Sequence, residues 1–132
     1  MSERNVKLVL AAGERIDEAG GAIPELVHDD AVLTAPEGWP EPGPFRGKSA
    51  VLRQFERLFG DYSTSHSTDM EVVADENDWV VFGFRWHTLG AGSGIANTWE
   101  MACAVRIEDR RFIEMHYRWS EEEALEAAGL SR

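Results

Sequence analysis

Apolar residues recur every three or four positions in several segments of the chain, and this spacing predicts helices. Residues 6–19 and residues 47–59 each carry one apolar stripe of this kind. Residues 23–27 fit a short helix between them, with a proline in its first turn. Residues 121–128 predict a last short helix, because Ser120 can cap it and acidic residues fill its first turn.

The second half of the chain has the composition of β-strands. Three long runs, residues 78–89, 95–107 and 111–120, are rich in aromatic and apolar residues. The turn residues that separate them are few, so we expect the three strands to be antiparallel neighbours. Two shorter strands are expected at residues 31–35 and 70–74.

Helices followed by a run of strands predict an α+β fold, a curved antiparallel sheet packed against three N-terminal helices. The whole chain, residues 1–132, is expected to form one domain. Four of the five prolines fall in residues 36–44, which cannot pair in a central strand. We interpret this segment as a semi-rigid flap that carries Trp39.

Side chains alternate between the two faces of a strand, which divides the long strands into two sets. Pairing Met101 with both Phe84 and Tyr117 keeps each set on one face. The bulky set fills a dense core or lines a cavity, and it comprises Phe82, Phe84, Trp86, Trp99, Met101, Cys103, Val105, Ile113, Met115, Tyr117 and Trp119. The small and charged set is a solvated face or a dimer face, and it comprises Gly83, Arg85, His87, Thr98, Glu100, Ala102, Ala104, Arg106, Glu114, His116 and Arg118.

Composition narrows the classes of partner. The chain has 24 acidic residues against 13 Lys and Arg, a net charge of −11, which disfavours nucleic-acid binding. No apolar run approaches the roughly 18 residues of a membrane span, and the polar start resembles no secretion signal, so we expect a cytoplasmic protein. Five Trp, six Phe and two Tyr exceed what a small core needs, and this points to a pocket.

Several of these segments together resemble a known family. They are the first helix, the acidic pair after His28, the proline-rich segment 36–47, the Ser93-Gly94 connection and the ending at residues 123–130. They look like a SnoaL-like protein of the nuclear transport factor two-like superfamily, and the similarity spans nearly the whole chain. The resemblance implies a cone-shaped α+β barrel with a ligand cavity, and a homodimer through the outer sheet face (Arg85, His87, Glu100, His116 and Arg118).

Residues 111–120 are similar to the last strand of ketosteroid isomerases, which implies that Met115, Tyr117 and Trp119 face the cavity. The catalytic residues of those enzymes do not carry over. The general-base Asp falls at Ala35, the oxyanion Tyr at Gly13 and the protonated oxyanion Asp at Cys103. The resemblance therefore implies the fold and the cavity, but not that reaction.

Three residues are candidates for proton-transfer chemistry. Tyr117 is a hydrogen-bond donor to a carbonyl or oxyanion, or a core tyrosine bonded to the backbone. Asp17 lies one turn after Gly13 and reaches the cavity mouth, or is one of many solvated acids. His28 is a catalytic imidazole, or a packed one at the close of a short helix. We expect Cys103 to be a buried, unreactive thiol, and we expect neither a metal nor a cofactor.

These observations leave three hypotheses open. The chain is a cyclase, isomerase or hydratase acting on a flat apolar or polycyclic molecule, a non-catalytic binder of such a molecule, or a structural dimer with a solid core. For the first two, the residues expected to contact the ligand are Trp39, Phe82, Phe84, Trp86, Trp99, Met101, Cys103, Met115 and Trp119.

Overall fold

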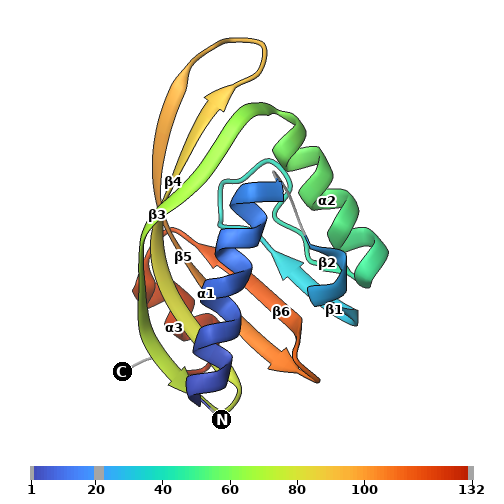
Figure 1. Ribbon diagram of the computed structural model, residues 1–132, viewed down its shortest axis with the longest axis vertical. Coiled ribbons are helices and arrows are strands. Elements are labelled where there is room, and N and C mark those ends of the chain that lie inside the picture. The colour runs from blue at the N-terminus through green and yellow to red at the C-terminus, as the bar shows by residue number, and fades with distance from the viewer. Residues whose placement is uncertain (1, 20–22, 131–132) are drawn as a thin grey trace.

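The computed structural model describes residues 2–19 and 23–130, and the side chains of residues 2 and 17–19 lie outside the described part. Three α-helices and a six-stranded open sheet form the α+β fold that the sequence predicts (Figure 1). The helices are α1 (Ser2–Ala19), α2 (Lys48–Gly60) and α3 (Glu121–Ala127). The strands are β1 (Val27–Thr34), β2 (Phe45–Arg46), β3 (Tyr62–Glu76), β4 (Trp79–Gly90), β5 (Ala96–Glu108) and β6 (Arg111–Arg118).

The sheet order is β2-β1-β6-β5-β4-β3, with β1 and β6 parallel and every other pair antiparallel. The four last strands form the antiparallel meander expected from their short connections. The turn between β5 and β6 places both Asp109 and Arg110 at positive φ, the backbone of a two-residue hairpin. The β4–β5 arm extends beyond the helices at the top of Figure 1.

The expected second helix is wrong. Only a single 3₁₀ turn, Pro24–Leu26, forms, and Val27 already pairs with Phe112 as the start of β1. Five residues are too few to repay helix nucleation, and the β-branched Val27 favours the strand. His28 therefore lies in a strand and not at a helix end.

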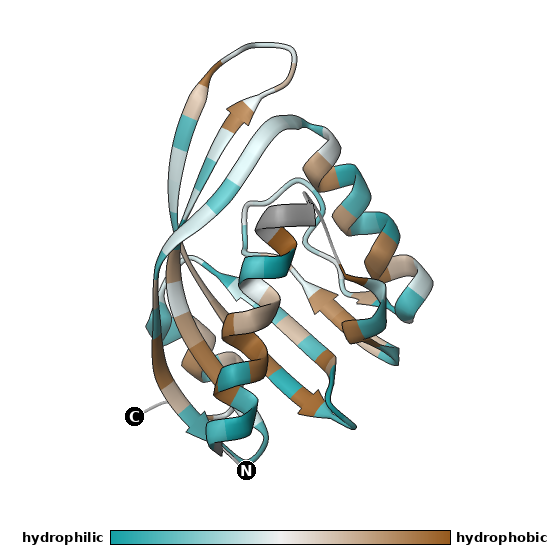
Figure 2. Ribbon diagram, in the orientation of Figure 1, coloured by the Kyte–Doolittle hydropathy of each residue, from teal (hydrophilic) through white to brown (hydrophobic). Residues whose placement is uncertain are grey.

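The third strand is much longer than predicted. β3 includes the polar residues 63–69, which precede the short strand expected at residues 70–74 and which Figure 2 shows in white and teal. β3 is an edge strand and pairs with one neighbour, β4. Its polar side chains contact side chains of β4. Thr68 Oγ1 lies 2.7 Å from His87 Nε2, and the His66 ring stacks on His87 at 4.8 Å.

The registers were predicted correctly on one side of β5 and wrongly on the other. Phe84 pairs with Met101, as expected, but Tyr117 pairs with Cys103 and not with Met101. β6 has a bulge at Ile113, which has no partner residue on β5. This extra residue shifts the register between the two strands. As a result Phe112, and not Ile113, belongs to the main core.

The two faces of the sheet carry separate cores. The inner face packs on α1 and α2, which contribute Val9, Ala12, Val51 and Phe55. The outer face was interpreted as solvated or dimeric, but α3 of the same chain covers part of it (Figure 1). Ala102 and Ala104 are small because Ala124 of α3 packs against them. Ser120 caps α3 as predicted, accepting a hydrogen bond from the Glu123 N–H.

Candidate functional site

A cavity of about 140 Å³ lies between α1, α2 and the inner face of the sheet. Because this space remains between the elements, the inner face is not a solid core. The walls of the cavity are almost wholly apolar. An engineered apolar cavity of roughly 150 Å³ stays dry and binds benzene, so this volume suits one six-membered ring. Six residues expected to bind ligand border it, namely Trp39, Phe82, Phe84, Trp86, Met101 and Met115.

The three other expected ligand contacts lie elsewhere. Trp99 and Trp119 line a neighbouring open groove of about 680 Å³, and Cys103 is fully buried without bordering the cavity. Trp39, Gln54 and Leu58 border both spaces. These three residues therefore lie between the cavity and the groove.

Trp39 covers the cavity from the flap. The backbone N–H of Trp39 donates to the carbonyl oxygen of Pro36 (3.1 Å). Gly38, the third residue of this turn, has a φ of +90°, which is typical of a type II turn. The indole of Trp39 lies against those of Trp99 and Trp119, with centroids 5.8 and 5.7 Å away. Aromatic pairs of this kind contribute about 0.5–1.5 kcal/mol beyond their buried area, so the rings hold the flap over the cavity.

Tyr117 is the one titratable side chain among the described residues that line the cavity. Its ring stands edge-on to Phe55 (6.4 Å) and Phe84 (6.3 Å), which fixes its orientation. Burial, and then the neighbouring Cys103, raise the pKa of the Tyr117 hydroxyl well above its ordinary value of 10.0. Tyr117 is therefore a phenol at neutral pH, and it offers a hydrogen-bond donor rather than a base.

Cys103 lies directly across from Tyr117 on β5. Burial raises the pKa of its thiol. Arg118 and the hydrogen bond with Tyr117 lower this pKa, but by less than burial raises it. A thiol in this state is no nucleophile, and sulfur is a weak acceptor. A carbonyl oxygen in the cavity would therefore replace Cys103 as the partner of the Tyr117 hydroxyl at little cost.

Gln54 is a polar residue in an apolar wall. It is 7% exposed, and its Oε1 has no hydrogen-bond partner within the described part of the chain. Sequence analysis did not single it out. The signal was present, however, because Gln54 lies on the helical stripe formed by Val51, Phe55 and Leu58.

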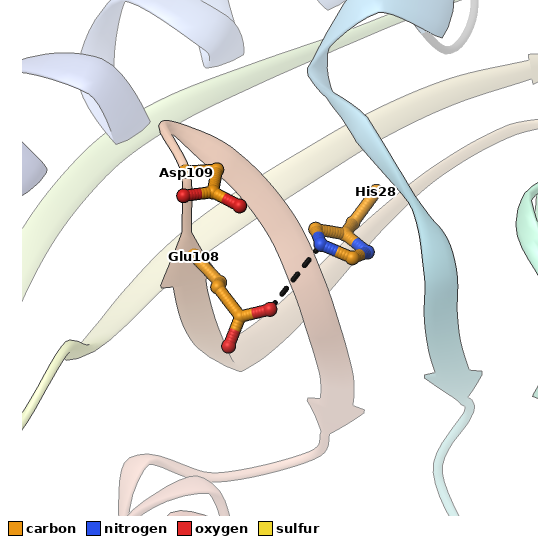
Figure 3. Close-up of side chains that lie close together, drawn as sticks. All are labelled: His28, Glu108 and Asp109. Atoms are coloured by element: carbon orange, nitrogen blue, oxygen red, sulfur yellow. Dashed lines mark ion pairs between the residues drawn. The ribbon is translucent and has the colours of Figure 1, made fainter.

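His28 is not among the described residues that line the cavity. Its Nδ1 accepts the Asp30 N–H (3.0 Å), so the neutral ring carries its proton on Nε2, which lies 3.3 Å from Glu108 Oε2 (Figure 3). Asp109 completes a group whose potential ligand atoms lie within 4.8 Å of one another. A metal on Nε2 would have to displace that proton, so this group fits an interstrand contact better than a cation site.

Two of the three positions that match the ketosteroid isomerase machinery line the cavity. Gly13 and Ala35 line it, and Cys103 contacts Tyr117 behind its wall. None of these side chains supplies a carboxylate or a phenol. The side chain of Asp17, which was expected to reach the cavity mouth one turn after Gly13, lies outside the described residues.

The SnoaL-like domain profile matches residues 15–115 of the chain. Among solved structures, a putative polyketide cyclase from Xanthomonas campestris pv. campestris has a TM-score of 0.76 at 16% identity, covering 92% of this chain and 94% of that one. TerC co-crystallised with polyporic acid has a TM-score of 0.71 at 16% identity, covering 92% and 98%. SalBIII, described as an epoxide hydrolase/cyclase-like enzyme in pyran ring formation, has a TM-score of 0.73 at 11% identity, covering 89% and 92%.

Comparison with curated proteins gives no significant match. At these identities the structural similarity establishes the shared fold. Among the described helices, none is both long and apolar enough to cross a membrane.

Proposed function

Since the chain belongs to the SnoaL-like domain family, we propose that it binds a small hydrophobic, aromatic molecule in the cavity beneath Trp39. The observation that carries this proposal is the apolar cavity of about 140 Å³ on the inner face of the sheet. One ring of the ligand occupies the cavity. The further rings of a polycyclic ligand extend into the groove once Trp39 moves aside, because Trp39 borders both spaces.

Tyr117 gives the bound molecule a polar contact. A protonated phenol beside an apolar ring site donates to a carbonyl oxygen, and this bond strengthens as negative charge develops on that oxygen. Such a contact suits a proton-transfer step of the cyclase, isomerase or hydratase type. The names of the structural neighbours, a putative polyketide cyclase and an epoxide hydrolase/cyclase-like enzyme, support this class of reaction.

A non-catalytic binder is the second candidate. It is favoured by Gly13, Ala35 and Cys103, which occupy the matching catalytic positions without acid or base groups. The two candidates share the same ligand site and differ in whether a bond changes. For the catalytic candidate we propose Asp17 as the proton acceptor. His28 does not serve as the base, because it does not line the cavity and its two ring nitrogens already contact Asp30 and Glu108.

The ligand site is tested with p-xylene, an apolar single-ring probe, titrated while the fluorescence of the tryptophans is followed. We expect saturable quenching, because Trp39 and Trp86 line the cavity. Native mass spectrometry of the freshly purified protein should also show a retained small molecule. No saturable binding of p-xylene and no retained molecule would contradict the proposal.

The role of Tyr117 is tested with a ketone probe, cyclohexanone. Tyr117→Phe keeps the ring and removes the hydroxyl, so we expect a loss of roughly three- to tenfold in cyclohexanone affinity, the effect of one hydrogen bond. Binding of p-xylene serves as the control and should not change. Equal affinities of the two proteins for cyclohexanone would rule out Tyr117 as the donor.

We also propose that two copies pair through the outer face of β4 and β5. Arg85 and Glu100 form an exposed cross-strand pair there (3.4 Å), beside the half-exposed His87. We leave His116 and Arg118 out of the proposed interface. The His116 side chain is 12% exposed and stacks on Trp79, while Arg118 donates to Thr34 (2.8 Å).

A further inference from the structure

Among the described residues, the wall of the cavity contains one buried side-chain acceptor without a hydrogen-bond donor. Gln54 Oε1 is shielded from solvent, and within the described residues it has no hydrogen-bond partner. A buried polar atom without a partner costs roughly the desolvation of that group, so native proteins keep few of them. Gln54 is also one of the residues that line the cavity, so a side-chain rotation that brings Oε1 to the cavity would let a bound ligand supply the missing donor.

The position of Gln54 strengthens this explanation. It lies on the apolar stripe of α2, next to Phe55. A leucine or methionine at this position would have a similar size and would bury no polar atom. Gln54 also borders both the cavity and the groove, as do Trp39 and Leu58. A ligand group that contacts Gln54 therefore lies at the entrance end of the cavity, under the flap.

We propose that Gln54 is a specificity-determining residue that accepts a hydrogen bond from a hydroxyl group on the bound ring. This inference rests on the proposed function, since it needs a ligand in the cavity, and it narrows the ligand class to hydroxylated aromatic molecules, phenols or enols. The two polar contacts are complementary. Tyr117 donates to an acceptor of the ligand, and Gln54 accepts from a donor.

The test compares p-cresol with p-xylene, which has nearly the same shape but a methyl group in place of the hydroxyl. Dissociation constants of both probes are measured for the wild type and for Gln54→Met, which is similar in size and lacks the acceptor. We expect the ratio of the p-xylene constant to the p-cresol constant to fall about three- to tenfold in Gln54→Met, because one hydrogen bond is lost.

Two further variants make the result specific. Leu58→Met changes another wall residue that borders the same two spaces without removing a polar atom, so any change in affinity should be similar for both probes and leave their ratio unchanged. Gln54→Glu keeps acceptor oxygens and removes the amide N–H, so it should preserve the preference for p-cresol. A preference lost equally in Gln54→Glu and Gln54→Met would overturn the acceptor role.

The outcomes separate this inference from the proposed function. If both probes bind and Gln54→Met leaves their ratio unchanged, the hydroxyl-binding role of Gln54 is wrong while the hydrophobic site stands. If neither probe binds the wild type, the ligand site itself is wrong and the inference fails with it. Circular dichroism of each variant establishes that the comparison is made between folded proteins.

Discussion

The indole N–H of Trp119 donates a hydrogen bond of 2.8 Å to the carbonyl oxygen of Glu37. Trp119 directly follows β6, so this contact joins the segment after the last strand to the flap, two residues before Trp39. The flap is also held by the Ala35 N–H, which donates to the carbonyl oxygen of Pro42 (2.8 Å). The covering position of Trp39 thus depends on one side-chain bond from the sheet as well as on ring contacts.

Replacing Trp119 by Phe should loosen the flap. The variant keeps an aromatic ring against Trp39 and loses the bond to Glu37, which is worth about 1 kcal/mol. If the flap must open for the ligand to leave, we expect p-xylene to dissociate about fivefold faster, the rate change that this energy corresponds to. Stopped-flow tryptophan fluorescence measures the rate.

Trp99→Phe is the matched control for the flap prediction. Its indole N–H donates to Thr88 Oγ1 (3.2 Å), within the β4–β5 pair, and not to the flap. Both variants therefore lose one indole hydrogen bond, but only one of them releases the flap. Equal dissociation rates in the two variants would show that the bond to Glu37 does not hold the flap in place.

The raised pKa of Tyr117 predicts how stability changes at alkaline pH. Its pKa in the folded protein lies above the unfolded value of 10.0, chiefly because of burial. The stabilisation from the protonated phenol is therefore fully present below about pH 10 and is lost as the pH rises through the folded pKa. We expect the free energy of unfolding, measured in urea at about pH 8 and about pH 11, to fall less in Tyr117→Phe than in the wild type.

Tyr62 provides the comparison for that measurement. Its pKa is also raised, by burial and then by the Asp61 carboxylate, but its side chain is partly exposed and lies outside the cavity. Tyr62→Phe should remove less of the alkaline loss than Tyr117→Phe does. If the three proteins lose stability in parallel, Tyr117 is not shielded as the structure indicates.

Cys103 should be unreactive in the folded protein. It is fully buried, and burial raises the pKa of its thiol, so the thiolate that attacks a disulfide reagent is scarce. We expect Ellman's reagent at about pH 8 to modify the native protein at least roughly a hundredfold more slowly than the protein in urea. Comparable rates would mean that β5 and β6 separate readily, or that the thiol is exposed.

Patterns along the chain predicted the long strands and the main helices because their periodicities come directly from burial on one face. They failed where an element is defined by its neighbours. The polar first half of β3 is a strand because β4 pairs with it, and residues 24–26 form only one turn because Val27 joins the sheet. Contacts of this kind, with residues far away in the chain, cannot be predicted from the local sequence.

The residues of the site were also predicted only in part. Alternation placed Phe84, Trp86 and Met101 on the inner face, but it did not separate the cavity that they line from the groove that Trp99 lines. That division depends on how the flap folds over the sheet. Gln54 was missed because its unpaired oxygen is visible only when all surrounding atoms are placed.

Pairing of two copies through the outer face stays a prediction, and Glu100→Arg tests it. Glu100 lies beside Arg85, which also approaches Asp69 (3.9 Å), so the substitution places two positive groups together. Each substitution acts twice in a symmetric dimer, so we expect the dimer dissociation constant to rise at least about tenfold in sedimentation equilibrium. Glu3→Arg, which makes the same charge change at the exposed start of α1, should leave the mass unchanged. A wild-type protein that sediments as a monomer at every concentration, or an unchanged mass in Glu100→Arg, would contradict this interface.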